Sequence, residues 1–152
     1  MKNKIHNINV VAKEKLPSPK ALKETLPLTN KARKTVLSKR KELMNILDGK
    51  DSRLVLVVGP CSIHDTNLAK DYALRLKDLS KEVEDEFLVL MRVYFEKPRT
   101  TTGWKGLIND PNIDDTFQID KAFTLLAHYS LTLMRWALGL QLRRLTRSCH
   151  SI

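Results

Sequence analysis

The amino-acid sequence predicts an α/β fold with parallel strands. Two apolar runs, residues 54–58 and 87–91, lack the polar alternation of a strand with one face in water. Residues 67–83, which lie between them, place their leucines and a tyrosine at helical spacing. A strand, a helix and a strand in this order form a βαβ unit, so we expect the two strands to be parallel neighbours.

The residues before the first strand are expected to form two helices. Prolines divide residues 1–28 into short pieces and leave room for a helix over about residues 20–25. Thr29 or Asn30 can cap a second helix, and the Asp-Gly pair that follows Leu47 can end it.

A long loop and a further helix are expected after the second strand, which continues to Val93. Residues 95–116 are polar and contain two prolines and two glycines, and loops of this length are usually functional or disordered. Residues 119 to about 142 return to helical spacing, so we expect one helix there.

Composition places the chain among ordinary globular proteins. Of its 152 residues, 42% are hydrophobic and 29% are charged, and no apolar stretch approaches the ~18 residues of a membrane span. The polar N-terminus lacks the apolar core of a secretion signal. The two cysteines form no disulfide framework. We therefore expect a cytoplasmic protein with no membrane partner.

The net charge of +10 lies at the two ends of the chain. Residues 1–42 carry 12 Lys and Arg against 3 acids, and residues 128–152 carry 4 against none. Residues 43–127 carry 11 against 14. A nucleic-acid-binding domain usually gathers its basic residues beside aromatics or a known motif, so we expect no nucleic-acid partner.

Chemically active residues follow both predicted strands. In parallel α/β folds, ligands bind at the carboxyl ends of the strands. Arg92 lies at the second end, and Lys97, Arg99 and Thr100 follow it. Arginine offers a planar fork to phosphate or carboxylate, and lysine offers a mobile charge. The pattern favours a pocket for an anionic, phosphorylated substrate over a solvated charged loop.

Cys61 follows the first strand and permits three interpretations. It can be a thiolate metal ligand, a nucleophile or a small buried residue. A small buried residue is the commonest of the three, and the position after a Gly-Pro pair raises the first two interpretations to about equal weight with it. His64 lies three residues further on, but a single Cys-x-x-His is a weak metal signal, because structural zinc usually needs four protein ligands.

Three stretches closely resemble the type I 3-deoxy-D-arabino-heptulosonate-7-phosphate (DAHP) synthases. The stretches are Gly59-Pro60-Cys61-Ser62-Ile63-His64-Asp65, residues 91–100 (Met-Arg-Val-Tyr-Phe-Glu-Lys-Pro-Arg-Thr) and residues 103–111 (Gly-Trp-Lys-Gly-Leu-Ile-Asn-Asp-Pro). The resemblance is strong from about Arg53 to Ala127. It implies a (β/α)₈ TIM barrel and a transferase that condenses phosphoenolpyruvate with erythrose 4-phosphate, the first step of the shikimate pathway to aromatic amino acids.

The resemblance also implies roles for six residues. Cys61 is one ligand of a divalent metal (Mn, Fe, Co or Zn). Arg92 and Lys97 are catalytic residues that contact phosphoenolpyruvate, and Arg99 and Thr100 hold the phosphate of erythrose 4-phosphate. Pro98 is a further substrate-binding residue. An aromatic amino acid is the implied effector, and a homo-oligomer is the implied assembly.

The chain is expected to hold only part of this fold. Residues 1–50 would be an N-terminal extension for oligomerisation or regulation, residues 51–127 the first two βα units of an incomplete barrel, and residues 128–152 an atypical tail. The family's other metal ligands, a His, a Glu and an Asp, come from later strands. We therefore expect this chain to be inactive; the alternative is a non-catalytic fragment that retains oligomerisation or effector binding. Exposed sheet edges and uncovered apolar faces would make it partly molten, prone to aggregate or dependent on partner subunits.

Residues 128–152 depart from the family pattern. They contain four arginines, no acid and many leucines. They can form a basic amphipathic helix. Alternatively, a shifted reading frame from the Ser130 codon can encode Ser-Asp-Ile-Asn-Glu-Met-Gly, which resembles the family at this point. We favour the hypothesis of a frameshifted or misassembled gene.

The frameshift hypothesis predicts that the family pattern continues in another reading frame of the gene after Ser130. Translation of the nucleotide sequence in all three frames tests this. If no frame restores the pattern, the tail is a genuine part of the protein.

Overall fold

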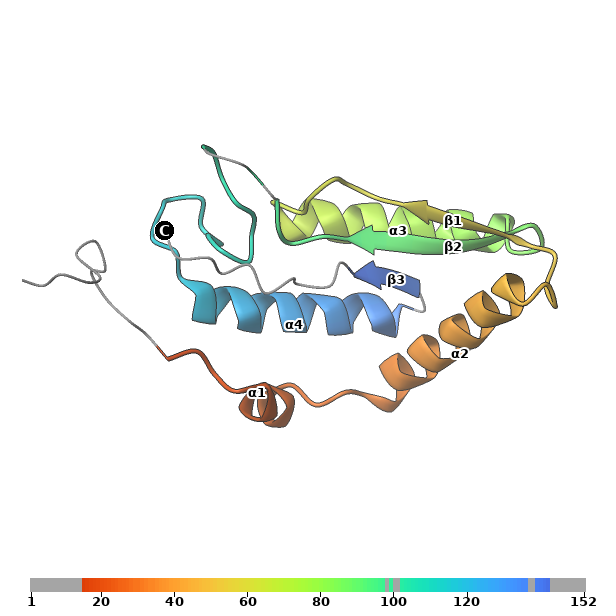
Figure 1. The fold of residues 1–152 in the computed structure, drawn as a ribbon, viewed down its shortest axis with the longest axis horizontal. Coiled ribbons are helices and arrows are strands. Elements are labelled where there is room, and N and C mark those ends of the chain that lie inside the picture. The colour runs from red at the N-terminus through yellow and green to blue at the C-terminus, as the bar shows by residue number, and fades with distance from the viewer. Residues whose placement is uncertain (1–14, 98, 100–101, 137–138, 143–152) are drawn as a thin grey trace, which may run out of the picture.

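The α/β architecture is present in the computed structural model as a three-stranded parallel sheet with helices packed around it (Figure 1). The model describes residues 15–97, 99, 102–136 and 139–142. The sheet has the order β1-β2-β3. The elements in chain order are α1 (Pro19–Thr25), α2 (Asn30–Leu47), β1 (Leu54–Val58), α3 (Thr66–Glu82), β2 (Phe87–Val93), α4 (Ile119–Arg135) and β3 (Gly139–Leu142).

The predicted βαβ unit is confirmed. β1 and β2 pair in parallel with Leu54 opposite Phe87 and Val58 opposite Met91, and α3 connects them. The side chain of Asp65 caps α3, because its carboxylate accepts hydrogen bonds from the backbone N–H groups of Asn67 and Leu68. The carboxyl ends of β1 and β2 therefore lie at the same edge of the sheet.

The two N-terminal helices also match their predicted positions. The Thr29 hydroxyl accepts a hydrogen bond from the Ala32 N–H at 3.2 Å and so caps α2. Gly49 ends the helix in a left-handed conformation, with φ +68°, which favours glycine. None of the described helices is both long enough and apolar enough to cross a membrane.

The prediction of one helix to about residue 142 is wrong. α4 ends at Arg135, and residues 139–142 form β3, which pairs in parallel with β2. A Cβ atom at Gly139 would meet a terminal methyl group of the Leu90 side chain, so a larger residue there would require that side chain to rotate. The helical spacing of apolar residues does not reveal that the free edge of β2 offers a row of hydrogen-bonding groups to a third strand. The expectation of only two strands is corrected in the same way.

The core lies around β2, which is buried on both faces. Val89, Met91 and Val93 pack into a cluster with residues of α3 and α4, including Ala73 of α3 and Leu133 of α4. On the other face, Leu90 lies beside Val36 and Leu43 of α2 around a small cavity. β2 thus connects the packing of all three long helices.

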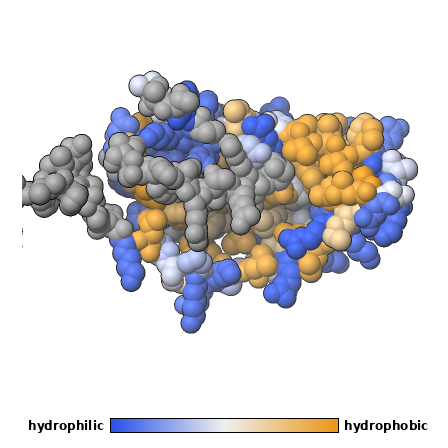
Figure 2. Space-filling view, in the orientation of Figure 1, coloured by the Kyte–Doolittle hydropathy of each residue, from blue (hydrophilic) through white to orange (hydrophobic). Residues whose placement is uncertain are grey.

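β1 does not have the two buried faces that its apolar run predicts. Leu54, Leu56 and Val57 are 65%, 40% and 45% exposed. β1 lies at the edge of the sheet, with β2 as its only paired strand in the described part. Figure 2 shows the resulting apolar surface over β1 and β2. The predicted tendency to aggregate depends on this exposed apolar surface, and it stays a prediction.

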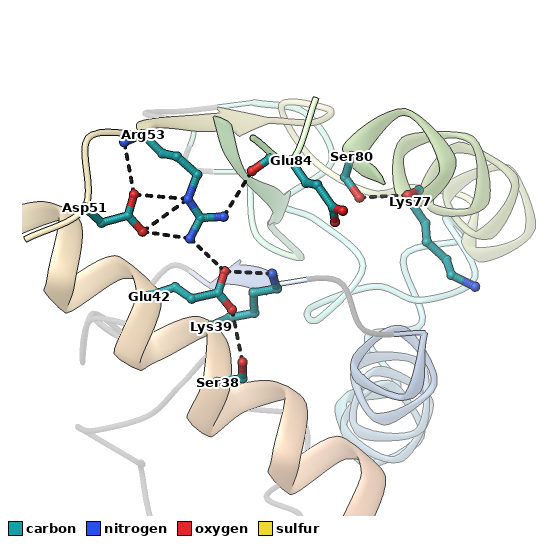
Figure 3. Close-up of polar contacts among 8 residues, drawn as sticks. All are labelled: Ser38, Lys39, Glu42, Asp51, Arg53, Lys77, Ser80 and Glu84. Atoms are coloured by element: carbon teal, nitrogen blue, oxygen red, sulfur yellow. Dashed lines mark hydrogen bonds and ion pairs between the residues drawn. The ribbon is translucent and has the colours of Figure 1, made fainter. Parts of the chain in front are cut away.

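Arg53 joins α2 to the start of the sheet (Figure 3). Its guanidinium binds Asp51 at 2.8 Å and Glu42 of α2 at 3.2 Å, and Nη1 donates to the carbonyl of Glu84, which lies between α3 and β2. Desolvation raises the pKa of Glu42, but hydrogen bonds from Lys39, Ser38 and Arg53 and the charge of Lys39 lower it further, so the pKa lies below its ordinary value. Hydrogen bonds from Arg53 also lower the pKa of Asp51.

This network predicts a pH-dependent stability. Because the pKa of Glu42 is lower in the folded chain, its contribution is complete above the ordinary value of 4.5 and is lost as the pH falls through the folded value. We expect the free energy of unfolding in urea to decrease over this acidic range. Arg53→Gln should lower it by about 1 kcal/mol near neutral pH and make the acidic decrease shallower.

Arg75→Gln is the matched control, since Arg75 pairs with Asp71 on the exposed surface of α3. Its effect should stay within about 0.5 kcal/mol. An equal effect of the two substitutions would contradict the structural role given to Arg53.

Candidate functional site

The candidate site begins where β1 and β2 end side by side. Gly59 follows β1 with φ +151° and lies against the backbone of Arg92. A Cβ atom at Gly59 would lie 2.6 Å from the Arg92 carbonyl oxygen and 3.1 Å from the Arg92 Cβ. Only glycine lets the two chain segments approach this closely.

The structure brings Cys61 and Arg92 together, as the strand order predicts. Arg92 Nη2 donates a hydrogen bond to the Cys61 carbonyl at 3.2 Å. The guanidinium also lies over the Tyr94 ring, 4.3 Å from its centroid, in the geometry of a cation–π interaction. A backbone hydrogen bond from Ile63 to the Tyr94 carbonyl, at 2.8 Å, ties the same two segments together, and Ile63 is buried.

Arg92 keeps hydrogen-bonding capacity at this edge. Its Nε and the Ser62 hydroxyl are buried atoms for which the described residues supply no hydrogen-bond partner. A buried donor without a partner is costly, so these two atoms mark the polar part of the site. The guanidinium has a fixed position and a free donor, which suits it to hold an anionic group.

Lys97 and Arg99 are held by residues further along the same loop. The Lys97 N–H donates to the Lys105 carbonyl at 2.8 Å, and Arg99 Nε donates to the Trp104 carbonyl at 3.1 Å. The side chain of Lys97 is half-buried and that of Arg99 is exposed. Pro98 and Thr100, the other predicted substrate-binding residues, lie outside the described residues.

The predicted metal ligand stands without partners in the described part of the chain. Cys61 is exposed, and no group of three or more His, Cys, Asp or Glu side chains among these residues could hold a metal ion. Asp65 lies nearby in sequence, but its carboxylate caps α3, and the backbone hydrogen bonds from Leu68 and Asn67 hold its pKa below the ordinary value. One thiolate does not make a metal site, so the donor set present does not fit a metal on its own.

None of the roles predicted from the sequence involves Tyr94, Trp104 or Tyr129. Tyr94 follows Arg92 at the spacing that places two residues on one face of an extended strand, which is a signal readable from sequence. Tyr129 of α4 is buried, and its ring meets that of Phe95 edge to face at 6.0 Å. Desolvation raises the pKa of Tyr129. Its contact with Phe95 depends on how α4 packs, and no spacing in the sequence predicts it.

The comparisons with known proteins agree with this geometry. Residues 25–140 match the model of the DAHP synthetase I family. The chain is 58% identical over 108 residues to the Phe-sensitive phospho-2-dehydro-3-deoxyheptonate aldolase of Escherichia coli K12 and 42% identical over 139 residues to the Tyr-sensitive enzyme of the same strain. These matches cover 71% and 91% of this chain.

A solved structure is similar as well. The phospho-2-dehydro-3-deoxyheptonate aldolase of Francisella tularensis matches with a TM-score of 0.85 and 42% identity over 90% of this chain. The chain spans 31% and 39% of the two Escherichia coli relatives and 40% of the Francisella chain. The match covers most of this sequence, and the chain belongs to the DAHP synthetase I family.

Proposed function

We propose that this chain carries part of the substrate-binding site of a DAHP synthase. The observation that supports this most is the position of Arg92. Its guanidinium is oriented by the Cys61 carbonyl and the Tyr94 ring at the edge of the sheet where β1 and β2 both end. Lys97 and Arg99 follow in the loop after β2. This supplies three cations next to one sheet edge.

The proposed reaction needs such a set of charges. The alkene carbon of phosphoenolpyruvate would bond to the aldehyde carbon of erythrose 4-phosphate, water would add at the carbon that bears the phosphate of phosphoenolpyruvate, and that phosphate would leave as inorganic phosphate. Both substrates carry phosphate groups that repel one another. Arg92 and Lys97 would bind phosphoenolpyruvate, and Arg99 and Thr100 would bind the phosphate of erythrose 4-phosphate, with Pro98 as a further substrate-binding residue. Holding two mutually repelling anions at bonding distance removes a large part of the entropic barrier.

Arg92 would bind its ligand with little rearrangement. One face of the guanidinium lies against Tyr94 and Nη2 is already bound, while Nε is buried and has no partner among the described residues. A carboxylate or phosphate oxygen would therefore bind at the terminal guanidinium nitrogens without displacing an existing bond, whereas Nε is covered and would be reached only if the atoms around it moved.

We propose the fold, the metal ligand and the pathway of the family for this chain as well. β1 with α3 and β2 with α4 would be the first two βα units of a (β/α)₈ barrel, and β3 would be its third strand. Cys61 would be one metal ligand, and the others would have to come from outside the described residues. The intact protein would act in the shikimate pathway, in the cytoplasm. The 152-residue chain by itself would bind substrate without turnover.

Binding of phosphoenolpyruvate to the 152-residue chain, measured by calorimetry, tests the proposal. Arg92→Ala and Lys97→Ala should each weaken binding at least about tenfold, since a hydrogen bond to a charged group contributes about 1.5–3 kcal/mol. Product formation with erythrose 4-phosphate and added manganese should stay at background.

Arg75→Ala is the control, because it removes one positive charge from the exposed face of α3. It should leave the affinity unchanged. Absence of binding by the unsubstituted chain, or equal losses in all three variants, would contradict the assigned site. Turnover above background would contradict the account of the metal ligands.

A second function, self-association through the N-terminal helices, is favoured by the surface of α2. Leu37, Met44 and Leu47 of this helix are 57%, 58% and 76% exposed. Leu37 and Met44 are two helical turns apart and so lie on one face.

The names of the relatives include Phe-sensitive and Tyr-sensitive forms, and we propose an aromatic amino acid as effector of this chain as well.

Sedimentation velocity distinguishes the second function. If α2 forms the contact, Leu37→Glu should shift the 152-residue chain toward the monomer, because a charge in an apolar contact is strongly unfavourable. Leu79→Glu on α3 is the matched control, since Leu79 is 50% exposed. A monomeric unsubstituted chain, or an equal shift in both variants, would contradict the proposal.

A further inference from the structure

The loop after β2 folds back on itself through residues 103–110, which we call the bracing segment. Two backbone hydrogen bonds join it to the residues that carry the cations. Lys97 N–H donates to the Lys105 carbonyl at 2.8 Å, and Ile108 N–H donates to the Phe95 carbonyl at 3.1 Å. Leu107 and Ile108 are buried in the core. The bracing segment is therefore anchored in the core by Leu107 and Ile108 and hydrogen-bonded to Phe95 and Lys97.

Gly106 is the point of closest approach. Its φ is +112°, a conformation that favours glycine. A Cβ atom there would lie 2.5 Å from the Phe95 carbonyl oxygen, 2.7 Å from the Glu96 Cα and 2.8 Å from the Lys97 backbone nitrogen. These neighbours are backbone atoms, so any side chain at Gly106 must push the Lys97 backbone away.

Trp104 connects the bracing segment to Arg99. The carbonyl of Trp104 accepts a hydrogen bond from Arg99 Nε at 3.1 Å, and its indole N–H donates to the Asp110 carbonyl at 2.9 Å. The Asp110 side chain is 2% exposed and accepts backbone hydrogen bonds from Asp114 and Asp115. The exposed Arg99 side chain is thus connected through Trp104 to Asp110, whose buried carboxylate is held by backbone hydrogen bonds.

We propose that Gly106 and Trp104 are positioning residues that set where Lys97 and Arg99 stand. Neither would need to touch the ligand. Gly106 sets the height of the Lys97 backbone by allowing the bracing segment to approach it, and Trp104 limits the directions open to the Arg99 side chain. The identity of the ligand rests on the proposed function, but the bracing itself is a property of this chain in the absence of any ligand.

Amide hydrogen exchange of the unliganded 152-residue chain tests the bracing directly. Gly106→Ala should raise the exchange rates of the Lys97 and Ile108 amides at least about tenfold, because both lose their acceptors. The Leu54 amide, which donates to the Glu86 carbonyl at the far end of the sheet, should keep its rate. Affinity for phosphoenolpyruvate should fall at least about tenfold in the same variant.

Gly49→Ala is the matched control for backbone strain. Gly49 also has a positive φ, +68°, but a Cβ there would meet nothing within 4 Å. This variant should change neither the Lys97 exchange rate nor the affinity. Unchanged Lys97 exchange in Gly106→Ala would overturn the proposal, and so would faster exchange with unchanged affinity.

Trp104→Phe provides the second test if Gly106→Ala does not fold. It keeps a six-membered aromatic ring and removes the indole N–H together with the five-membered ring, so we expect faster exchange confined to residues 97–110 and a loss of affinity of about threefold to tenfold. Equally faster exchange at Leu54 would mean general destabilisation and overturn the positioning role. If the unsubstituted chain binds no phosphoenolpyruvate, the proposed function fails, while the exchange data still decide the bracing.

Discussion

The parallel pairing of β1 with β2 is the interaction on which the candidate site depends. Residues 59–65 follow β1, whereas Arg92 and the residues after it lie at and beyond the end of β2, and only a parallel register brings both sets to one edge. Gly59 makes this approach closer still, because its missing side chain leaves room for the backbone of Arg92. The hydrogen bond from Arg92 to the Cys61 carbonyl is a direct consequence. Without the pairing, Lys97 and Arg99 would have no fixed position relative to the residues that follow β1.

Two kinds of support act on the cations at this edge. Arg92 is held from the side, by Tyr94 and the Cys61 carbonyl. Lys97 and Arg99 are held by hydrogen bonds that they donate to backbone carbonyls of the bracing segment. The buried side chains of Leu107 and Ile108 connect the second support to the core, so loop residues gain the precision of the packed interior.

The described part of the chain combines a well-buried centre with incompletely covered elements. β2 is enclosed by α2, α3 and α4, whereas the apolar side chains of β1 and of the outer face of α2 are exposed. Arg53 crosses between these regions by bonding Glu42 of α2, Asp51 and the Glu84 carbonyl. The exposed apolar surfaces on two separate elements are the physical reason to expect contacts with further protein.

Much of the local structure and the family could be predicted from the sequence. The continuous apolar runs determined β1 and β2, and the Thr29 cap and the Asp-Gly stop determined α2, because these signals act over a few neighbouring residues. The motifs around Cys61 and Lys97 identified the family for the same reason. The tertiary structure alone decided the end of α4 and the pairing of β3 with β2, since a free sheet edge outweighs the helical spacing of the leucines. It also decided the roles available to Gly106 and Trp104, because the backbone of residues 95–97 meets Gly106, and Arg99 meets Trp104, only when the loop folds back on the core.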